Sequence, residues 1–372
     1  MLKDIYIFAN SGNLKEMPKS GGQTSARRVM KGLESLGYEI HPIKKHRSEW
    51  KGKWAHVIEI LLFALYDVIK IFCRLVFKRR KGAVFMMLTY AGSLVPLEFI
   101  ITIMVKCLGF KSTYYLKGGK LIDTYPSGGR IHKWMFKKIM DWQELVFFEG
   151  MECLHIVQNI SSTQLVYFPN YIADGKLGMF EGKQKQPFGI IYFGRVAPAK
   201  NVHIIIEAYQ LLCEKYPDLR LTIIGGSTRD VAYAKQIEKM IAESPYHDRI
   251  QKLGNSPFEV LLKEMKTHHF FIFPSREEAE GQSNSLTEAM SQGLIPIVSN
   301  WHFNKTIVGN DDFVIEGYNP KDYADAVDRI ISSGNMDKYM NEVQKRIRDY
   351  YTESIVLHNI NDALKQVLSP QH

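Results

Sequence analysis

The stretch GIIYFGRVAPAKNVHIIIEAYQLLCEKYPDLRLTIIGG, residues 189–226, decides the fold. Its first part, 189–195, is an apolar run with the length of a buried strand, 201–216 has the apolar spacing of a helix, and 219–226 is a second strand that ends in two glycines. A strand, a helix and a strand in this order predict parallel strands joined by a crossover helix. The fold class is therefore predicted to be α/β.

The same alternation continues along the 372 residues, a length that suggests two domains at about 100–200 residues each. In the first half we expect strands at 3–10, 38–43, 83–90, 112–118 and 152–159, and helices at 25–37, 57–77, 95–108 and 129–150. In the second half we expect further strands at 249–254, 269–274 and 294–299, further helices at 231–244, 256–265 and 283–292, and helical structure over the C-terminal residues.

The composition of the segment between the two halves predicts the domain boundaries. Residues 169–187 are rich in Gly, Lys and Gln and have little periodicity, which is typical of a linker. We expect an N-terminal domain at 1–170, a linker at 171–187, a C-terminal domain at 188–350 and a helix at 351–372 that packs back on the first domain. Two doubly wound, Rossmann-like domains should face each other across a cleft, with ligands at the carboxyl ends of the strands.

Composition excludes several classes of protein. Apolar residues are 45% and charged residues 23% of the chain, as in ordinary globular proteins. The absence of C-x-x-C, H-E-x-x-H and G-x-G-x-x-G disfavours a cysteine zinc site, a metalloprotease and use of NAD. The first residues are too polar for a signal peptide, and we expect a cytoplasmic protein. Four cysteines without paired spacing fit a reducing compartment: Cys73, Cys107, Cys153 and Cys213.

Charge is distributed unevenly along the chain. Residues 1–187 hold 28 Lys and Arg against 15 Asp and Glu, whereas residues 188–372 hold 20 against 24. Only the first half should therefore be attracted to polyanions. The densest basic segment is 44–81, and we expect it to contact an anionic membrane surface. No nucleic-acid motif is present, so nucleic acid is disfavoured as a partner.

The apolar run 57–77 inside this basic segment is long enough to cross a bilayer. Its ionisable residues share one stripe at helical spacing: Glu59, Asp67, Lys70 and Arg74. An amphipathic helix tolerates such a stripe better than a transmembrane helix does. Two interpretations stay open, namely a core-facing helix whose charged stripe faces water and a helix that lies on anionic lipid.

The first candidate site is PSREEAEGQSNSLTEAM, residues 274–290. A strand is expected to end at Pro274 and a helix to begin at Ser283, Asn284 and Ser285, which are typical N-cap residues. The free backbone amides and the dipole of such a helix start favour a bound anion.

Two carboxylates frame this helix start. Glu280 comes just before it, where Gly281 lets the backbone turn, and should face the next part of a ligand. Glu288 lies inside the helix, where its carboxylate can accept hydrogen bonds from two vicinal hydroxyls, as on a ribose. Taken alone, the two glutamates could also be solvated helix residues or a glycosidase-like acid and base.

The second candidate site is FGRVAPAKN, residues 193–201. The strand ends at Gly194, and Arg195 and Lys200 flank a tight Ala-Pro turn before the next helix. Two cations beside a strand end suit a diphosphate, which an arginine can bind through two parallel hydrogen bonds. The diphosphate favours transfer from an activated donor over the glycosidase alternative.

Together the two motifs resemble those of glycosyltransferase family 4, whose members are retaining, nucleotide-sugar-dependent enzymes with the GT-B fold. The family's pattern of Glu, Gly and a second Glu eight positions after the first falls on Glu280, Gly281 and Glu288. Its Gly-Arg…Lys motif falls on Gly194, Arg195 and Lys200. Segment 20–40, with Gly21 and Gly22, is similar to the family's N-terminal glycine loop and first helix, and 114–129 is similar to bacterial capsular and exopolysaccharide enzymes.

The resemblance implies a role for each matching residue. Arg195 and Lys200 would neutralise the diphosphate, Glu280 would face the donor sugar, and these three are the expected catalytic residues. Glu288 would hold the ribose, Leu253 would flank the base and Gly22 would close over the phosphates from the other domain. The remaining donor-binding residues would be Gly194, Gly281, Gln282, Ser283, Asn284 and Ser285.

The sequence departs from the family at two positions. Many members have a histidine near the donor sugar and acceptor where this chain has Lys117. We expect Lys117 either to contact the acceptor or donor sugar, or to be a structural cation near Asp123 or a helix end. Residues 301–308, WHFNKTIV, replace a glycine-rich turn.

The resemblance implies transfer of a sugar, from a UDP-sugar rather than a GDP-sugar, to a hydroxyl of a glycan, with the leaving phosphate taking the acceptor proton. No metal and no cofactor are expected. The basic N-terminal half, which the resemblance makes the acceptor-binding domain, suggests a polyprenyl-diphosphate-linked acceptor at the inner face of the plasma membrane. Two alternatives stay open: a sugar-nucleotide epimerase of related architecture and a non-catalytic nucleotide-sugar-binding protein.

Overall fold

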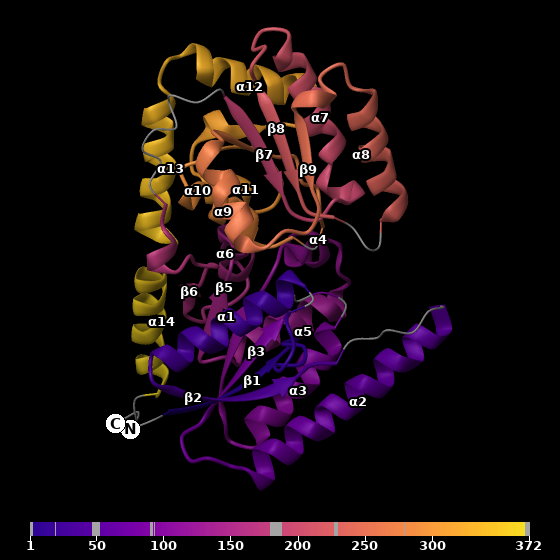
Figure 1. The fold of residues 1–372 in the computed structure, drawn as a ribbon. Helices are drawn as coiled ribbons and strands as arrows, with labels where there is room; N and C mark the ends of the chain where they lie inside the picture. The colour runs from indigo at the N-terminus through magenta and orange to yellow at the C-terminus, as the bar shows by residue number, and fades with distance from the viewer. Residues whose placement is uncertain are drawn as a thin grey trace. The chain divides into compact units, whose positions relative to one another are not determined.

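The structure is a computed structural model that describes residues 3–18, 20–46, 53–89, 92, 94–178, 188–226, 230–278 and 280–368. Residues 179–187 of the predicted linker and 47–52 of the basic segment lie outside the described residues. The chain divides into two units, Met1–Asn170 with Ile355–His372 and Tyr171–Ser354. Figure 1 shows that each unit is built from strands and helices in alternation.

The first unit contains one parallel sheet of six strands in the order β2-β1-β3-β4-β5-β6. The strands are β1 (Lys3–Ala9), β2 (Tyr38–Lys44), β3 (Val84–Thr89), β4 (Lys111–Leu116), β5 (Leu145–Phe148) and β6 (Leu165–Tyr167). The helices are α1 (Gly21–Ser35), α2 (Lys53–Phe77), α3 (Val95–Cys107), α4 (Lys120–Ser127), α5 (Arg130–Asp141), α6 (Met151–Gln158) and α14 (Glu353–Leu368).

Helices cover both faces of this sheet, and its central strands are therefore apolar on both sides. Every residue of β3 is buried, as expected for a strand inside a parallel sheet. In Figure 1, α2 and α14 lie on opposite sides of the strands. The C-terminal helix α14 is held by a hydrogen bond from the Tyr38 hydroxyl to Asn361 Oδ1 (3.0 Å) and another from Lys111 Nζ to the Val367 carbonyl (2.5 Å).

The prediction for residues 129–159 has the wrong elements. The predicted helix 129–150 is α5 followed by the buried strand β5, and the predicted strand 152–159 is the helix α6. The strand LVFF is only four residues long and follows α5 closely, so its apolar side chains extend the helical pattern without a break. In α6, the buried residues Cys153 and Val157 are four positions apart, which is helical spacing.

Two helices begin at other residues than predicted. α1 starts at Gly21, four residues early, because the Ser20 side chain caps it by accepting a hydrogen bond from the Gln23 backbone N–H. Gly21 and Gly22 therefore form the first turn of a helix instead of a loop. The helix α9 begins at Phe258, two residues later than predicted, and the Ser256 hydroxyl donates to the Gly254 carbonyl at 3.2 Å.

The structure contradicts one of the two interpretations of residues 57–77, the one in which the charged stripe faces water. Glu59 and Asp67 are buried, and Lys70 and Arg74 are half-buried. Many apolar side chains of α2 are exposed, among them Leu61, Leu65 and Ile69, whereas Ile71 and Leu75 are buried. Among the described residues, no helix combines the length and the apolar character needed to cross a membrane.

The second unit also contains one parallel sheet, in the order β12-β11-β10-β7-β8-β9. Its strands are β7 (Gly189–Phe193), β8 (Arg220–Ile224), β9 (Ile250–Leu253), β10 (Phe270–Phe273), β11 (Ile295–Ser299) and β12 (Val314–Ile315). Its α-helices are α7 (Val202–Cys213), α8 (Val231–Glu243), α9 (Phe258–Thr267), α10 (Asn284–Ser291), α11 (Asn304–Val308), α12 (Pro320–Ser332) and α13 (Met336–Tyr350). Its 3-10 turns are η1 (Asp174–Lys176), η3 (Pro198–Lys200), η4 (His247–Arg249) and η5 (Asp311–Phe313).

The strand order of the second unit marks where a ligand should bind. β7 is first in sequence but lies inside the sheet, between β8 and β10. The chain moves from β7 toward β8 and β9, and later returns to the other side of β7 as β10. In open parallel sheets, the crevice at the carboxyl ends of the two strands where the order reverses is the usual ligand site. Here those strands are β7 and β10.

Candidate active site

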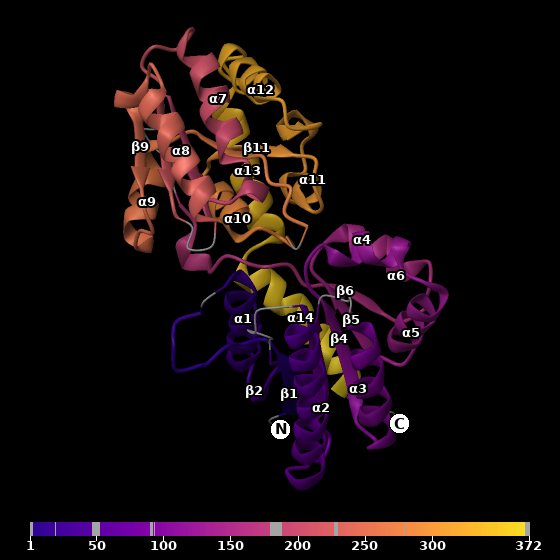
Figure 2. The same cartoon turned by 90° about the vertical axis from the view of Figure 1, so that its right-hand side faces the viewer.

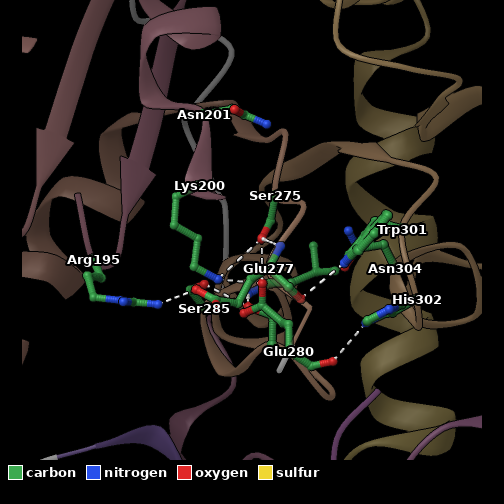
Figure 3. A network of polar contacts seen from close by, with 12 residues as sticks. Arg195, Lys200, Asn201, Ser275, Glu277, Glu280, Ser285, Trp301, His302 and Asn304 are labelled. Carbon is green, nitrogen blue, oxygen red and sulfur yellow. Dashed lines mark hydrogen bonds and ion pairs between the residues drawn. The ribbon is translucent and has the colours of Figure 1, made fainter. Parts of the chain in front are cut away.

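Both predicted motifs lie at the carboxyl ends of β7 and β10. β7 ends at Phe193, so Arg195 follows it directly, and η3 then brings Lys200 back to the same edge of the sheet. β10 ends at Phe273, and the loop from Ser275 to Glu280 follows it. Figure 3 shows the side chains of Arg195, Lys200, Ser275 and Glu280 close to one another. Because β7 and β10 are neighbours in a parallel sheet, the two motifs at their carboxyl ends lie together in one site.

Backbone contacts fix the two strand ends. Asn201 has a left-handed backbone (φ 50°), and its side-chain Nδ2 donates to the Pro274 carbonyl at 2.8 Å. The Arg276 backbone N–H donates to the Ala199 carbonyl at 2.8 Å. Behind them, Gly225 has φ 127° and comes so close to Gly194 that an added Cβ would lie 2.0 Å from the Gly194 carbonyl oxygen. These contacts hold the loop before Lys200 against the loop after β10.

The buried ammonium of Lys200 is the centre of the polar network. It forms an ion pair with the Glu280 carboxylate and lies 3.2 Å from Ser275 Oγ, which donates to Glu280 Oε2 at 2.5 Å. Lys200 is only 7% exposed and also lies over the Phe273 ring, 5.3 Å from its centroid. The carboxylate and the hydroxyl together hold the Lys200 ammonium in one position. From there the ammonium could donate a hydrogen bond to a phosphate oxygen.

Arg195 is the second cation, and it is half exposed, with 46% of its side chain accessible. Its guanidinium forms an ion pair with Glu277. The buried Tyr192 hydroxyl donates to the Arg195 carbonyl at 2.8 Å and fixes the backbone. Burial, assisted by the negative charge of Glu280, raises the pKa of Tyr192 well above its ordinary value, so the phenol stays protonated and donates.

The start of α10 supplies hydrogen-bond donors beside the two cations. Ser283 caps the helix by accepting a hydrogen bond from the Leu286 backbone N–H (3.5 Å), and its hydroxyl lies 2.9 Å from the Ser285 hydroxyl. Gln282 and Ser283 are buried, whereas Asn284 and Ser285 are half-buried. Glu288, also half-buried, follows in the second turn of α10. Backbone amides and a helix dipole at this position favour a bound anion.

The segment that replaces the expected glycine-rich turn clamps the loop between β10 and α10. Trp301 Nε1 donates to the Glu277 carbonyl at 3.1 Å, and His302 Nδ1 donates to the Glu280 carbonyl at 3.2 Å. The two rings stack with their centroids 4.6 Å apart, and His302 has a positive φ of 43°. Figure 3 shows both side chains on the far side of the loop from Arg195. The positions of Glu277 and Glu280 therefore depend on residues 301–302.

The family to which part of this chain is similar fits a site that binds a diphosphate. Residues 179–347, which include the whole site described above, match the family described as glycosyl transferases group 1. The similarity to group 1 glycosyltransferases thus extends over residues 179–347, somewhat less than half of the chain. The predicted resemblance to glycosyltransferases, including enzymes of capsular polysaccharide synthesis, is confirmed by this match and by the names of the relatives.

Individual relatives are similar over part of the chain. The GDP-mannose:cellobiosyl-diphosphopolyprenol alpha-mannosyltransferase of Xanthomonas campestris is 36% identical over 110 residues, which are 30% of this chain and 28% of that protein. The capsular polysaccharide biosynthesis glycosyltransferase CapM of Staphylococcus aureus is 22% identical over 177 residues, 45% of this chain and 43% of that protein. The chain thus spans less than half the length of these curated relatives.

Solved structures match along almost the whole chain. Anabaena HepE in complex with UDP has a TM-score of 0.71 at 12% identity, covering 98% of this chain and all of that one. The fold is GT-B, as predicted.

Two predicted site residues belong to the first unit. Gly22 lies in the first turn of α1. Lys117 follows β4 and is buried, with its Nζ 2.5 Å from Ser25 Oγ, 3.1 Å from Glu149 Oε1 and 3.3 Å from Asn170 Oδ1. Burial lowers the pKa of Lys117, while Glu149 acts in the opposite direction. The main ionic partner of Lys117 is therefore Glu149 and not Asp123.

Leu253 lies at the carboxyl end of β9, two strands from β7 in the same sheet, and its contact with a base stays a prediction. Five residues of the candidate site were not predicted individually: Asn201, Ser275, Glu277, Trp301 and His302. For Ser275 a signal exists, because it directly follows a strand end, as Gly194 does. Glu277 was hidden among the three glutamates of SREEAE, and no spacing relates Trp301 or His302 to that loop.

A metal site was not predicted. In the part of the chain that the structure describes, one group of acidic and histidine side chains could hold a metal ion, namely Asp4, Glu39 and His41 in the first unit. The guanidinium of Arg80 already lies 3.1 Å from Asp4 Oδ1 and 3.2 Å from Glu39 Oε1. An arginine in this place neutralises the carboxylates that a metal ion would need.

Proposed function

We propose that this protein is a retaining glycosyltransferase that moves a sugar from a nucleotide diphosphate sugar to a hydroxyl of a glycan. One observation carries the proposal: Arg195, Lys200, Glu280 and the capped start of α10 meet at the carboxyl ends of β7 and β10. Two cations and free helix amides suit a diphosphate, and the adjacent carboxylate suits sugar hydroxyls.

The donor is a UDP-sugar in this proposal. Arg195 and Lys200 bind the two phosphates, with the amides of Ser283, Asn284 and Ser285 around the distal one. Glu288 accepts hydrogen bonds from the ribose, Leu253 flanks the base and Glu280 faces the sugar. The UDP complex of Anabaena HepE, which has the same fold, supports UDP, whereas the Xanthomonas relative is named for GDP-mannose. A thermal-shift comparison of UDP- and GDP-sugars separates the two, because the bound nucleotide stabilises only the folded state.

The reaction forms a bond between the acceptor oxygen and the anomeric carbon and breaks the bond from that carbon to the phosphate oxygen. The electron pair of the broken bond leaves with the nucleoside diphosphate, and a phosphate oxygen takes the acceptor proton. Attack on the face from which the phosphate leaves retains the configuration. Arg195 and Lys200 stabilise the negative charge that grows on the leaving diphosphate, so no metal is required for that task.

The acceptor is proposed to be a glycan on a polyprenyl diphosphate, bound by the first unit. The excess of positive charge over residues 1–187 supports an anionic acceptor and a reaction at the inner face of the membrane, with the protein in the cytoplasm. The names of two relatives, one for a diphosphopolyprenol substrate and one for capsular polysaccharide, support a role in cell-surface polysaccharide synthesis.

The test is transfer of radiolabelled sugar from the UDP-sugar that gives the largest thermal shift to a lipid extract that contains acceptors. We expect Glu280→Gln and Arg195→Ala to reduce transfer by about 10²-fold or more, since they remove groups that act on the transition state. Glu278→Gln, an exposed neighbour in the same loop, is the matched control and should transfer normally. Donor binding without transfer would favour the alternative of a non-catalytic nucleotide-sugar-binding protein. Conversion of the donor sugar in the absence of an acceptor would favour the alternative of a sugar-nucleotide epimerase.

A further inference from the structure

The outward face of α2 is apolar along its described length. Ile58, Leu61, Leu62, Leu65, Ile69 and Phe72 are all exposed, with Leu61 at 64% and Leu65 at 60%. On a helix, positions 58, 61, 62, 65, 69 and 72 follow the three- and four-residue steps of one face. Exposed apolar stripes of this extent are typical of surfaces that meet another apolar phase or partner.

The ionisable residues of α2 face the protein instead. Asp67 is 2% exposed, and its carboxylate accepts hydrogen bonds from the His46 backbone N–H (3.1 Å) and ring Nδ1 (2.5 Å). Glu59 is 5% exposed, and burial lowers the pKa of the half-buried Lys70. The inward face of α2 thus holds these charges together with the buried Ile71 and Leu75, and its outward face is apolar, unlike that of a helix on a water-facing surface. Rotation of α2 to hide the apolar face would break the contacts of Asp67 with His46.

Exposed apolar side chains continue on the neighbouring helices of the first unit. α3 packs beside α2 and exposes Ile100 and Ile103, and α5 packs beside α3 and exposes Ile131 and Trp134. Figure 2 shows α2 and α3 side by side along one face of the first sheet. A tryptophan at the rim is common where a protein meets the interface of a bilayer.

The charges near α2 indicate the chemical nature of the partner that binds its apolar face. α2 is followed directly by the exposed cations Lys78, Arg79, Arg80 and Lys81. Residues 1–187 carry 28 Lys and Arg against 15 Asp and Glu. Apolar side chains beside lysines and arginines suit an anionic lipid surface, which offers acyl chains and phosphates together. A second copy of the chain would bring the same cations to this face, and like charges oppose such a contact.

We propose that α2 lies in the headgroup region of an anionic bilayer, with the face of Leu61, Leu65 and Ile69 toward the acyl chains and with Lys78 and Lys81 at lipid phosphates. With 25 residues, α2 offers a contact about 37 Å long. The apolar side of α2 makes the contact with the bilayer, whereas its buried charges, such as Asp67, hold the helix on the protein.

This inference rests on the proposed function only in one respect: a lipid-linked acceptor would require the protein to work at a membrane.

The test measures binding to vesicles without any donor or acceptor. Flotation compares vesicles of phosphatidylcholine alone with equimolar phosphatidylcholine and phosphatidylglycerol. We expect the wild type to bind the mixed vesicles and Leu61→Ser/Leu65→Ser/Ile69→Ser to bind them on the order of a hundredfold more weakly. Leu211→Ser/Val231→Ser, which removes exposed apolar groups from the second unit, is the matched control and should bind like the wild type.

A second pair of variants tests the charge. Lys78→Gln/Lys81→Gln should weaken binding to mixed vesicles by about tenfold or more, at roughly 1 kcal/mol per lysine. Arg80 is left in place because it pairs with Asp4 and Glu39. Polar replacements of exposed side chains should leave the fold intact, which circular dichroism checks.

Three results would overturn the inference. The first is a wild type that does not float with the mixed vesicles, and the second is a triple serine variant that floats equally well. The third is a lipid-free dimer that the triple variant converts to a monomer, since a second copy would then cover the apolar face of α2. Failure of the proposed function is separate. A protein that floats through α2 but shows no thermal shift with any nucleotide sugar would disprove the transferase and leave the membrane contact standing.

Discussion

Lys200 and Glu280, which lie 80 residues apart in the sequence, form an ion pair in which the ammonium is buried and the carboxylate nearly so. Each charge stabilises the other in a place with little water, and Ser275 contacts both. A diphosphate that binds Lys200 must therefore share this cation with Glu280. The pair links the segment after β7, which holds Lys200, to the loop after β10, which holds Glu280.

Removal of both members of this pair should lower stability by less than the sum of the two single removals. Lys200→Met and Glu280→Gln should each reduce the free energy of unfolding by about 1–3 kcal/mol, because each leaves an unpaired polar group. The double variant should lose less than the sum, with a coupling energy of about 1–3 kcal/mol. Urea unfolding measures all three, and all three should be inactive. Additive losses would mean that the two charges do not interact.

Glu277 should compete with the donor for Arg195. The carboxylate and the guanidinium form an ion pair at a half-exposed position, so the donor must displace Glu277. Glu277→Gln should tighten UDP binding by up to about fivefold, the value of an exposed pair of 0–1 kcal/mol. Isothermal titration at low salt measures the change, with Glu278→Gln as the neighbouring control. Weaker UDP binding in Glu277→Gln would instead make Glu277 part of the donor site.

The pH dependence of stability should carry a contribution from Glu98 in the first unit. Burial raises the pKa of Glu98 above its ordinary value of 4.5, although Lys45 lies 3.7 Å away and the Tyr114 hydroxyl donates to it at 2.5 Å. A carboxyl with a raised folded pKa contributes stability below its unfolded pKa and loses that contribution as pH rises through the folded pKa.

Wild type should therefore lose stability relative to Glu98→Gln as pH rises above 4.5, until the folded pKa is passed. Denaturant unfolding of both proteins over this range measures the difference, and effects of all other groups cancel in it. Glu34→Gln, an exposed carboxylate on α1, is the control for loss of one charge. A difference that grew in favour of the wild type would contradict the raised pKa.

The approach of Gly225 to Gly194 allows no side chain. A methyl group at position 225 would lie 2.0 Å from the Gly194 carbonyl oxygen, and φ is 127°. Gly225→Ala should reduce the free energy of unfolding by about 2–4 kcal/mol and should weaken UDP binding, since Arg195 follows Gly194. Gly226→Ala is the matched control, because its added methyl would lie 3.6 Å from its nearest neighbour, Asn255. Thermal unfolding that ranked the two variants equally would disprove the close approach.

The sequence predicted the site where local rules suffice. The main residues of the site each follow a strand end or begin a helix, namely Arg195, Lys200, Glu280 and Ser283. Parallel strands bring such positions to one edge of the sheet. Trp301 and His302 could not be predicted, since their contacts with the loop of Glu277 depend on how β11 and α11 pack.

The errors in the first half have the same physical origin. β5 was missed because LVFF directly extends the apolar pattern of α5, and short apolar runs fit either element. For α2, periodicity separated the apolar and charged faces correctly, but it carries no information about which face the protein covers. That choice depends on the surroundings, such as His46 beside Asp67.

The return of the chain to the first unit at Ile355 limits how this protein can be divided. Ile360 and Leu364 of α14 are fully buried, so a fragment that stops at Asn170 would leave an uncovered apolar surface on an otherwise intact sheet. Chimaeras that exchange halves between enzymes must therefore carry both ends of the chain together, and a reporter fused after residue 354 would replace an integral part of the N-terminal half.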